Sequence, residues 1–160
     1  MSRTMQQDLG ASLERAVADG AELYVNRRIA RIAKVSTPII QLSRVSATGE
    51  FKAKHEHDAH VDFYGVMLER AGSHLRGRAI AIECKATLDD RFVFSALRPQ
   101  QRDWLADTQL AFVLIDFVTH GGCRLIPWSQ FKPGASVNNT NGWQVSAVDC
   151  LAPLLDGRAL

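Results

Sequence analysis

Glu83 and Lys85 are two opposite charges that end an otherwise apolar stretch, Ala79-Ile80-Ala81-Ile82-Glu83-Cys84-Lys85-Ala86. Side chains of a strand alternate between its two faces, so Ile80 and Ile82 share one face while Glu83 and Lys85 share the other. Burying charges at a strand end costs several kcal/mol per ion before they pair. Such a placement therefore indicates charges with a function, and a metal site is the first hypothesis.

A second carboxylate, that of Asp62, lies in the stretch Val61-Asp62-Phe63-Tyr64-Gly65. We expect this stretch to be a short strand that pairs with the Glu83 strand as a hairpin. The two carboxylates and a main-chain carbonyl such as that of Cys84 would offer hard oxygen ligands, which suit Mg²⁺ and also Mn²⁺. Such a cation polarises a phosphoryl oxygen, and Lys85 would hold the attacking hydroxide or offset transition-state charge. The pattern predicts metal-dependent hydrolysis of a phosphodiester.

Each of these residues also has a simpler interpretation. Glu-x-Lys alone is a weak motif because it arises often by chance, but its position at the end of an apolar strand, with Asp62 on the preceding strand, favours a nuclease. Gln101 would contact a phosphate or water beside Lys85 or would only start a helix, and the second interpretation is preferred. Glu14 would add a carboxylate or would stabilise the N-terminus of the first helix, and again the second is preferred.

The elements that must position these residues follow from hydrophobic periodicity. Residues 9–26 have the spacing of a helix, with Asp8 placed to cap it. Strands are expected at 29–35, 39–45, 51–54, 61–65, 79–86 and 110–118, of which the last is the most apolar run in the chain. A second helix begins near Pro99, and 123–127 is expected to return as the hairpin partner of 110–118. This order predicts one α/β domain over residues 1–160.

Residues 36–56 are expected to protrude, because they contain few large apolar side chains. Between residues 22 and 54 the basic residues far outnumber the acidic ones, Glu22 and Glu50, so this segment is either a surface for a polyanion or an ordinary solvated face. The candidate DNA contacts are Arg27, Arg28, Lys34, Arg44, Lys52 and Lys54. The histidines that follow, His55, His57 and His60, leave three interpretations open: a metal site, a loop lining DNA or the active site, or a plain polar loop.

Composition narrows the class of protein. The chain has 160 residues, 46% of them hydrophobic, and a net charge of +2, which fits one domain with a real core. The three cysteines, Cys84, Cys123 and Cys150, are widely spaced and lack C-x-x-C pairing, as expected in a reduced, cytoplasmic protein. No apolar run approaches the ~20 residues that span a bilayer, so we expect no membrane partner.

The motifs together resemble the RecU-type Holliday-junction resolvases, also called penicillin-binding-protein-related factor A, within the PD-(D/E)xK nucleases. The resemblance extends from about Leu13 to Phe131. Its pieces, in chain order, are Leu13-Glu14, Lys34, Thr37-Pro38-Ile39-Ile40-Gln41, Asp62-Phe63-Tyr64-Gly65, Ile82-Glu83-Cys84-Lys85-Ala86, Gln101 and Phe112-Val113-Leu114-Ile115.

The resemblance implies a restriction-endonuclease-like α/β fold, with a mixed central β-sheet flanked by helices. It implies that Asp62 and Glu83 bind the divalent metal and that Lys85 serves the nucleophile. It further implies a homodimer that nicks opposing strands of a four-way junction symmetrically. Residues 36–56 would be the family's stalk, which enters the junction centre. Residues 133–160 lie beyond the part that resembles the family and are expected to be a C-terminal extension. Resolvases of this kind are also encoded by phages, which allows a role in phage recombination or DNA packaging.

The sequence departs from the family pattern in places that bear on junction selectivity more than on cleavage. The stalk is short, its tip lacks a dense Lys-Arg run, and His55 to His60 replaces a Ser/Thr-rich approach to Asp62. Two alternatives stay open. One is another PD-(D/E)xK nuclease, of restriction or repair type, and the other is a catalytically silent junction-binding protein. The intact set Asp62, Glu83 and Lys85 argues against the silent protein.

Overall fold

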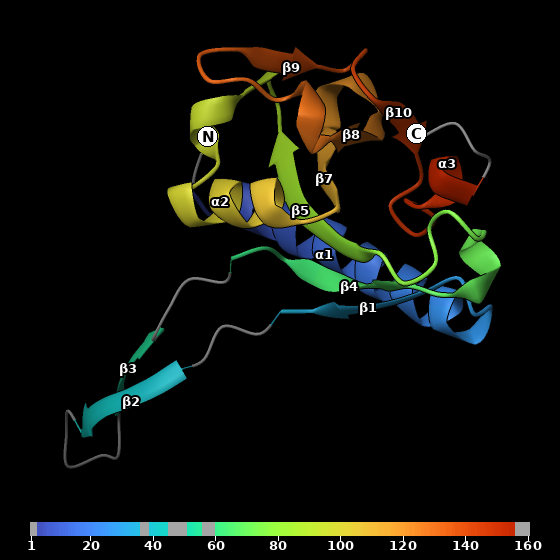
Figure 1. Cartoon of the computed structure of the whole chain (residues 1–160). Coiled ribbons are helices and arrows are strands. Elements are labelled where there is room, and N and C mark those ends of the chain that lie inside the picture. The colour runs from blue at the N-terminus through green and yellow to red at the C-terminus, as the bar shows by residue number, and fades with distance from the viewer. Residues whose placement is uncertain (1–2, 36–38, 45–50, 56–59, 156–160) are drawn as a thin grey trace.

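A six-stranded sheet forms the centre of the computed structural model, which describes residues 3–35, 39–44, 51–55 and 60–155 (Figure 1). The parallel pair at its middle is β5 (Ala79–Thr87) and β7 (Leu110–Phe117). The other neighbouring pairs are antiparallel, so the sheet is mixed, as the family resemblance predicted. The strand order is β1 (Ala30–Lys34), β4 (Phe63–Met67), β5, β7, β8 (Gly122–Pro127) and β10 (Trp143–Val145).

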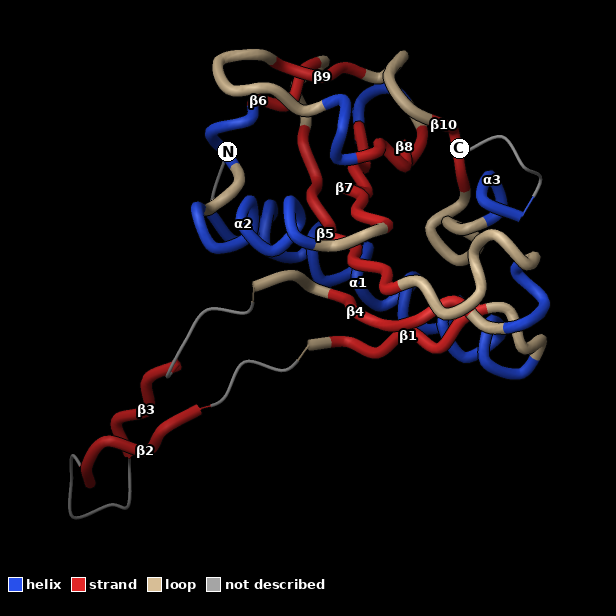
Figure 2. Tube along the Cα trace, in the orientation of Figure 1, coloured by secondary structure: helices blue, strands red, loops and turns tan. Residues whose placement is uncertain are grey.

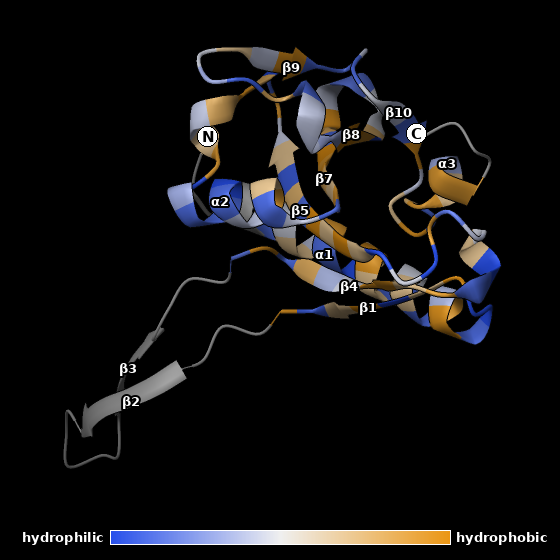
Figure 3. Ribbon diagram, in the orientation of Figure 1, coloured by the Kyte–Doolittle hydropathy of each residue, from blue (hydrophilic) through white to orange (hydrophobic). Residues whose placement is uncertain are grey.

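Helix α2 (Pro99–Asp107) lies in the connection between the two parallel strands, which cannot be joined by a tight turn. It follows strand β6 (Arg91–Val93) and the 3₁₀ helix η2 (Phe94–Ala96), and its first residue is proline, as predicted. On this side of the sheet the buried side chains of Leu105, Val113 and Ile115 belong to one apolar cluster. Figure 3 shows hydrophobic residues along β7, the most apolar strand predicted from the sequence. The helix and one sheet face thus share a core.

Helix α1 (Arg3–Asn26) covers the opposite face of the sheet. Leu13 and Val17 recur at helical spacing and are buried in the same cluster as Ile80 and Ile82. The helix begins at Arg3 rather than at the predicted Leu9, so the prediction that Asp8 caps it is wrong. The turns before Leu9 are polar, and apolar periodicity cannot detect a helix where no apolar stripe exists.

Residues 133–155 contribute strands β9 (Ser136–Asn138) and β10 and the short helix α3 (Ala152–Leu155). β9 pairs with β6, although residues 133–142 are rich in Gly, Ser, Asn and Thr, a composition that predicts a loop. β10 extends the central sheet. Leu151 and Leu154 are buried in the α1 cluster. The chain here passes so close to α1 that a Cβ on Gly20 would lie 2.0 Å from the carbonyl oxygen of Val148. This part of the chain is therefore built into the core.

Strands β2 (Ile39–Arg44) and β3 (Phe51–His55) form a separate antiparallel ribbon with a register shift between Gln41 and Ser43. Figures 1 and 2 show this ribbon away from the central sheet, on the side of β1 and β4. Both strands were predicted. The sequence Ser46-Ala47-Thr48-Gly49-Glu50 predicts a turn between them, and these residues lie outside the described part of the chain. Short 3₁₀ helices complete the fold: η1 (Glu69–Ala71), η3 (Val118–His120) and η4 (Trp128–Gln130).

Candidate active site

Asp62 and Glu83 lie side by side where strands β4 and β5 meet. The antiparallel register pairs Phe63 with Ile82, so the residue before β4 falls beside the residue that follows Ile82. The main-chain N–H of Cys84 donates a hydrogen bond of 2.8 Å to Asp62 Oδ2, which holds this carboxylate against β5. The strand itself starts at Phe63, one residue later than Asp62, but the predicted hairpin pairing of the two segments is confirmed.

Glu83 is a fully buried carboxylate whose two oxygens have different surroundings. Its Oε1 accepts hydrogen bonds from Lys85 Nζ and from Gln101 Nε2, each at 2.5 Å. Its Oε2 is buried and has no hydrogen-bond partner among the described residues. Buried polar atoms without a partner are rare in folded proteins and carry a desolvation cost. Oε2 therefore marks a position where a ligand would satisfy the site.

Both carboxylates are harder to ionise than usual. Burial raises the pKa of Glu83 to about 7; the nearby charge of Asp62 adds to the rise, while Lys85 and the nearby main-chain N–H of Asp62 oppose it. Burial also raises the pKa of Asp62, against the opposing effects of the Cys84 N–H and of Lys85. Two adjacent carboxylates, one fully buried and one half-buried, resist carrying two negative charges at once. A cation bound between them would remove this penalty.

The donor set fits a small, hard divalent cation. In an antiparallel pairing the N–H and C=O of one residue point to the same side, so the Cys84 carbonyl faces the side on which Asp62 lies. Two carboxylates and one carbonyl supply oxygen ligands only, and Mg²⁺ commonly completes its octahedron with water. Among the described residues no three His, Cys, Asp or Glu side chains gather into a metal-binding group, so such an ion would depend on these oxygens and on water.

Gln101 is buried on α2, as expected from its position on the face of that helix turned toward the sheet. Its Oε1 accepts the Arg98 N–H at 3.0 Å, which caps the start of the helix, and its Nε2 donates to Glu83. The preferred interpretation, that Gln101 starts the helix, is confirmed, while its contact with a phosphate or water beside Lys85 stays a prediction. Gln101 connects the start of α2 to the candidate site and orients the Glu83 carboxylate.

Glu14 lies in a different part of its helix from the one predicted from the sequence. Because α1 begins at Arg3, Glu14 lies well inside the helix, and the preferred interpretation that it stabilises the helix N-terminus is wrong. Its Oε2 lies 2.8 Å from Lys34 Nζ, and both charges act on the pKa of Asp62, Glu14 raising it and Lys34 lowering it. The signal that could have placed Glu14 here was the family resemblance of Leu13-Glu14.

The candidate DNA contacts fall in three places. Lys34 lies at the end of β1 nearest Asp62, opposite Phe63. Arg27 and Arg28 precede the other end of that strand, and Arg28 is ion-paired with Glu69. Arg44, Lys52 and Lys54 belong to the β2–β3 ribbon. The predicted basic segment is thus divided between the ribbon and the two ends of β1.

The three histidines are also separated. His55 ends β3, His57 lies outside the described residues, and the exposed ring of His60 stacks on Trp104 with a centroid distance of 4.9 Å. The described residues contain no histidine metal group. A dedicated histidine site therefore has no support among them.

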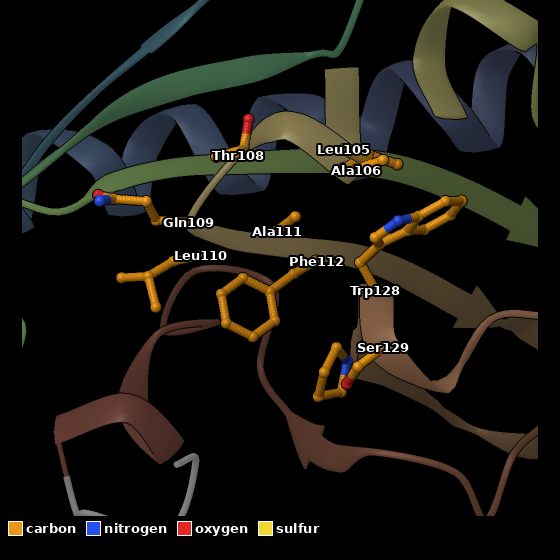
Figure 4. Close-up of a pocket in the computed structure, with 10 residues that line it drawn as sticks. Leu105, Ala106, Thr108, Gln109, Leu110, Ala111, Phe112, Trp128 and Ser129 are labelled. Atoms are coloured by element: carbon orange, nitrogen blue, oxygen red, sulfur yellow. The ribbon is translucent and has the colours of Figure 1, made fainter. Parts of the chain in front are cut away.

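A pocket of about 290 Å³ lies elsewhere, between the end of α2, the start of β7 and η4 (Figure 4). Its lining includes Leu105, Phe112 and Trp128 and no ionisable side chain. Leu110, also in the lining, is in register with Ile80 in the parallel pair, so the pocket lies toward the opposite end of β5 from Lys85. This pocket has no group for acid–base or metal chemistry.

Comparison with known proteins identifies the family to which the chain belongs. No curated protein matches the chain significantly. The family model of Recombination protein U, RecU, matches residues 8–147, a span that contains Glu14, Asp62, Glu83, Lys85 and Gln101. In the described part of the chain no helix is long and apolar enough to cross a membrane. With most of its length matched, the chain belongs to the RecU family of Holliday-junction-resolving nucleases.

Proposed function

We propose that this RecU-family protein is a Mg²⁺-dependent endonuclease that resolves four-way DNA junctions by paired, symmetric nicks, and that Mn²⁺ also supports its activity. The observation that carries the metal dependence is the buried Oε2 of Glu83, which has no hydrogen-bond partner among the described residues. Asp62 lies at the same strand end, and burial raises its pKa, as expected for a metal-binding carboxylate in the absence of its cation. The family match supports the junction as substrate.

Asp62 and Glu83, with the Cys84 carbonyl, would hold the cation. When bound, it would supply polarisation of the scissile phosphoryl group and would acidify a water molecule. The hydrogen bond from the Cys84 N–H fixes Asp62, while Lys85 and Gln101 both hold Oε1 of Glu83 and leave its Oε2 for the ligand. The protein thus contributes a preorganised set of oxygens.

Lys85 is the proposed partner of the nucleophile. Its side chain is 26% exposed, whereas that of Glu83 is fully buried, so the ammonium lies between the carboxylate and solvent. From this position it can orient an attacking water and offset the negative charge that develops on the phosphorus oxygens. Its ion pair with Glu83 keeps the long side chain at the site.

DNA would be held mainly through phosphates. Lys34 is 56% exposed beside the site, and the β2–β3 ribbon carries Arg44, Lys52 and Lys54, so both are suited to contact the branched substrate. Arg27 and Arg28, at the far end of β1, would contact a more distant part of a DNA arm. A homodimer would place two such sites on the junction, one for each of two opposing strands.

The test is cleavage of synthetic four-way, flap and linear duplex DNA with Mg²⁺, Mn²⁺ or EDTA, beside the Asp62→Asn variant. We expect the junction alone to be cut efficiently, at symmetric positions, only with a divalent cation and only by the wild type. Equal cleavage of linear duplex or flaps would favour the restriction or repair alternative. Junction binding without cleavage under every condition would favour the non-catalytic alternative. Mass measurement in solution tests the homodimer.

A further inference from the structure

Three aromatic rings gather on the surface next to the candidate site. The rings of His60 and Trp104 are stacked, with centroids 4.9 Å apart and planes 6° apart. Tyr64 meets Trp104 edge-on, with centroids 5.6 Å apart and planes at 76°. His60 is exposed, and Tyr64 and Trp104 keep 39% and 38% of their surface exposed. This aromatic cluster has no part in the metal chemistry proposed above.

The cluster adjoins the proposed catalytic residues along two separate segments of the chain. Tyr64 is the register partner of Ala81, so it points to the same sheet face as Glu83 and Lys85. His60 and Tyr64 flank Asp62 at two residues on either side. Trp104 follows Gln101 by one helical turn on α2, and Gln101 contacts Glu83. A DNA strand whose phosphate reached Asp62 and Glu83 would therefore come within reach of the cluster.

We propose that His60, Trp104 and Tyr64 form a stacking platform for a nucleobase that flanks the scissile phosphate. The inference rests on the proposed cleavage at the Asp62–Glu83 site and adds the group that positions the strand there. A base that has lost its neighbour at a branch point exposes its apolar face, which an aromatic surface can cover whatever the base is. In intact duplex that face is already covered, so the platform favours branched over linear DNA.

The stack could instead serve only to anchor the segment that leads to Asp62. A purely structural stack gains most when its rings are buried, because the stabilisation follows the apolar area removed from water. All three rings here remain open to solvent, at the edge of the site where substrate arrives. A test must therefore separate contact with the base from positioning of Asp62.

That separation comes from a cycle that combines protein variants with DNA lacking one base. Junctions carry a single abasic nucleotide on one side or the other of each mapped scissile phosphate. Their binding to wild type and to Trp104→Leu is measured without divalent cation. For wild type we expect removal of the stacked base to weaken binding by about 5- to 100-fold, the range for one base–aromatic stack. Trp104→Leu should lose as much on intact DNA and nothing further on that abasic DNA.

Three further variants serve as controls. Trp104→Phe keeps an aromatic ring, so binding by this variant should still weaken when the stacked base is removed. This variant also tests the base contact if the leucine substitution disturbs α2. His60→Ala should weaken binding in the same direction, and less strongly. Trp128→Leu removes a ring that stacks on Phe94 and Phe131 away from the site, so the abasic effect should persist in full.

The outcomes distinguish this inference from the proposed function. If the fold-losses in binding caused by Trp104→Leu and by base removal multiply at every nucleotide tested, the rings do not contact a base. The proposed junction cleavage would not be affected by that result. If the wild type cuts no junction and binds junction no better than duplex, the proposed function itself fails. Non-multiplying effects at one nucleotide, retained by Trp104→Phe, would establish the contact.

Discussion

Two hydrogen-bonded clusters, centred on the buried side chains of Tyr24 and Glu83, differ in one respect, which is whether each buried polar atom has a hydrogen-bond partner. In the Tyr24 cluster the tyrosine hydroxyl donates to Asp149 Oδ1 at 2.5 Å and accepts the Leu151 N–H at 2.9 Å. Burial, and then the bond to Asp149, raises the pKa of Tyr24 well above its ordinary value, so the hydroxyl stays protonated as a donor. The Tyr24 hydroxyl therefore has a partner both as a donor and as an acceptor.

In the Glu83 cluster the buried carboxylate has two partners on Oε1 and, among the described residues, no hydrogen bond on Oε2. The difference follows from what each cluster holds. The Tyr24 cluster ties the C-terminal segment to α1 and needs nothing further. In the Glu83 cluster the desolvation of Oε2 is not compensated by a hydrogen bond, and a bound ligand can supply the missing interaction. We therefore expect the fully hydrogen-bonded Tyr24 cluster to contribute to stability and the Glu83 cluster, with its unpartnered oxygen, to contribute to ligand binding.

The largest effect is expected from Glu83→Gln, which keeps the side chain's shape and removes the charge that would hold the cation. Because a bound cation contributes several kcal/mol to such a reaction, junction cleavage should fall about 1,000-fold or more. Single-turnover cleavage measures the loss. Glu22→Gln, the same change at an exposed carboxylate on α1, should leave the rate unchanged. A Glu83→Gln protein that cleaves at near the wild-type rate would remove this carboxylate from the mechanism.

Lys85→Met should lower cleavage by about 100- to 1,000-fold, the usual cost of losing one group that stabilises transition-state charge. Metal affinity should change much less, because both carboxylates remain. Cleavage rates and Mg²⁺ titrations, measured together, separate the two properties. Lys132→Met, on an exposed loop, is the matched control. A rate within tenfold of wild type would mean that Lys85 only pairs with Glu83.

Without divalent cation, the stability of the protein should depend on the ionisation of Glu83. The folded-state pKa of about 7 lies above the ordinary value of 4.5, so between these pH values the folded protein keeps a proton that the unfolded chain has released. The free energy of unfolding should therefore fall as pH rises through this window, by up to about 3 kcal/mol. Glu83→Gln should lack this component.

Denaturant unfolding of wild type and Glu83→Gln in EDTA, across pH 4.5 to 8, measures the difference between the two proteins. Added Mg²⁺ should then stabilise wild type at pH 8 and leave the variant unaffected. Parallel pH profiles of the two proteins would mean that Glu83 titrates normally in the fold.

The smallest effect is expected in the fully paired cluster. Tyr24→Phe leaves the buried Leu151 N–H and Asp149 without their partner, which should lower the free energy of unfolding by about 1–3 kcal/mol. Junction cleavage by the folded variant should match wild type. Tyr64→Phe, which removes an exposed hydroxyl, should leave stability unchanged. A cleavage defect in Tyr24→Phe would break the contrast between the two clusters.

Much of the fold was predictable because its elements follow simple periodicities. The alternation along β5, the apolar run of β7 and the proline that opens α2 each depend on neighbours in the chain, and all were predicted. The start of α1 was not, since its first turns carry no apolar stripe. The short strands β9 and β10 were also missed. β9 lies in a stretch rich in Gly, Ser, Asn and Thr, and β10 has only three residues, too few to show a periodicity.

The sequence by itself determined that Glu83 and Lys85 share one face of a buried strand and that Asp62 precedes its hairpin partner, since strand alternation and pairing are local rules. Only the tertiary structure decided that Gln101 donates a hydrogen bond to Glu83, that Glu14 pairs with Lys34, and that the ring of His60 stacks on Trp104. These contacts join helices to the sheet, and they depend on how each helix is rotated and shifted against it. That choice is made by the packing of both cores, which spacing along the chain does not specify.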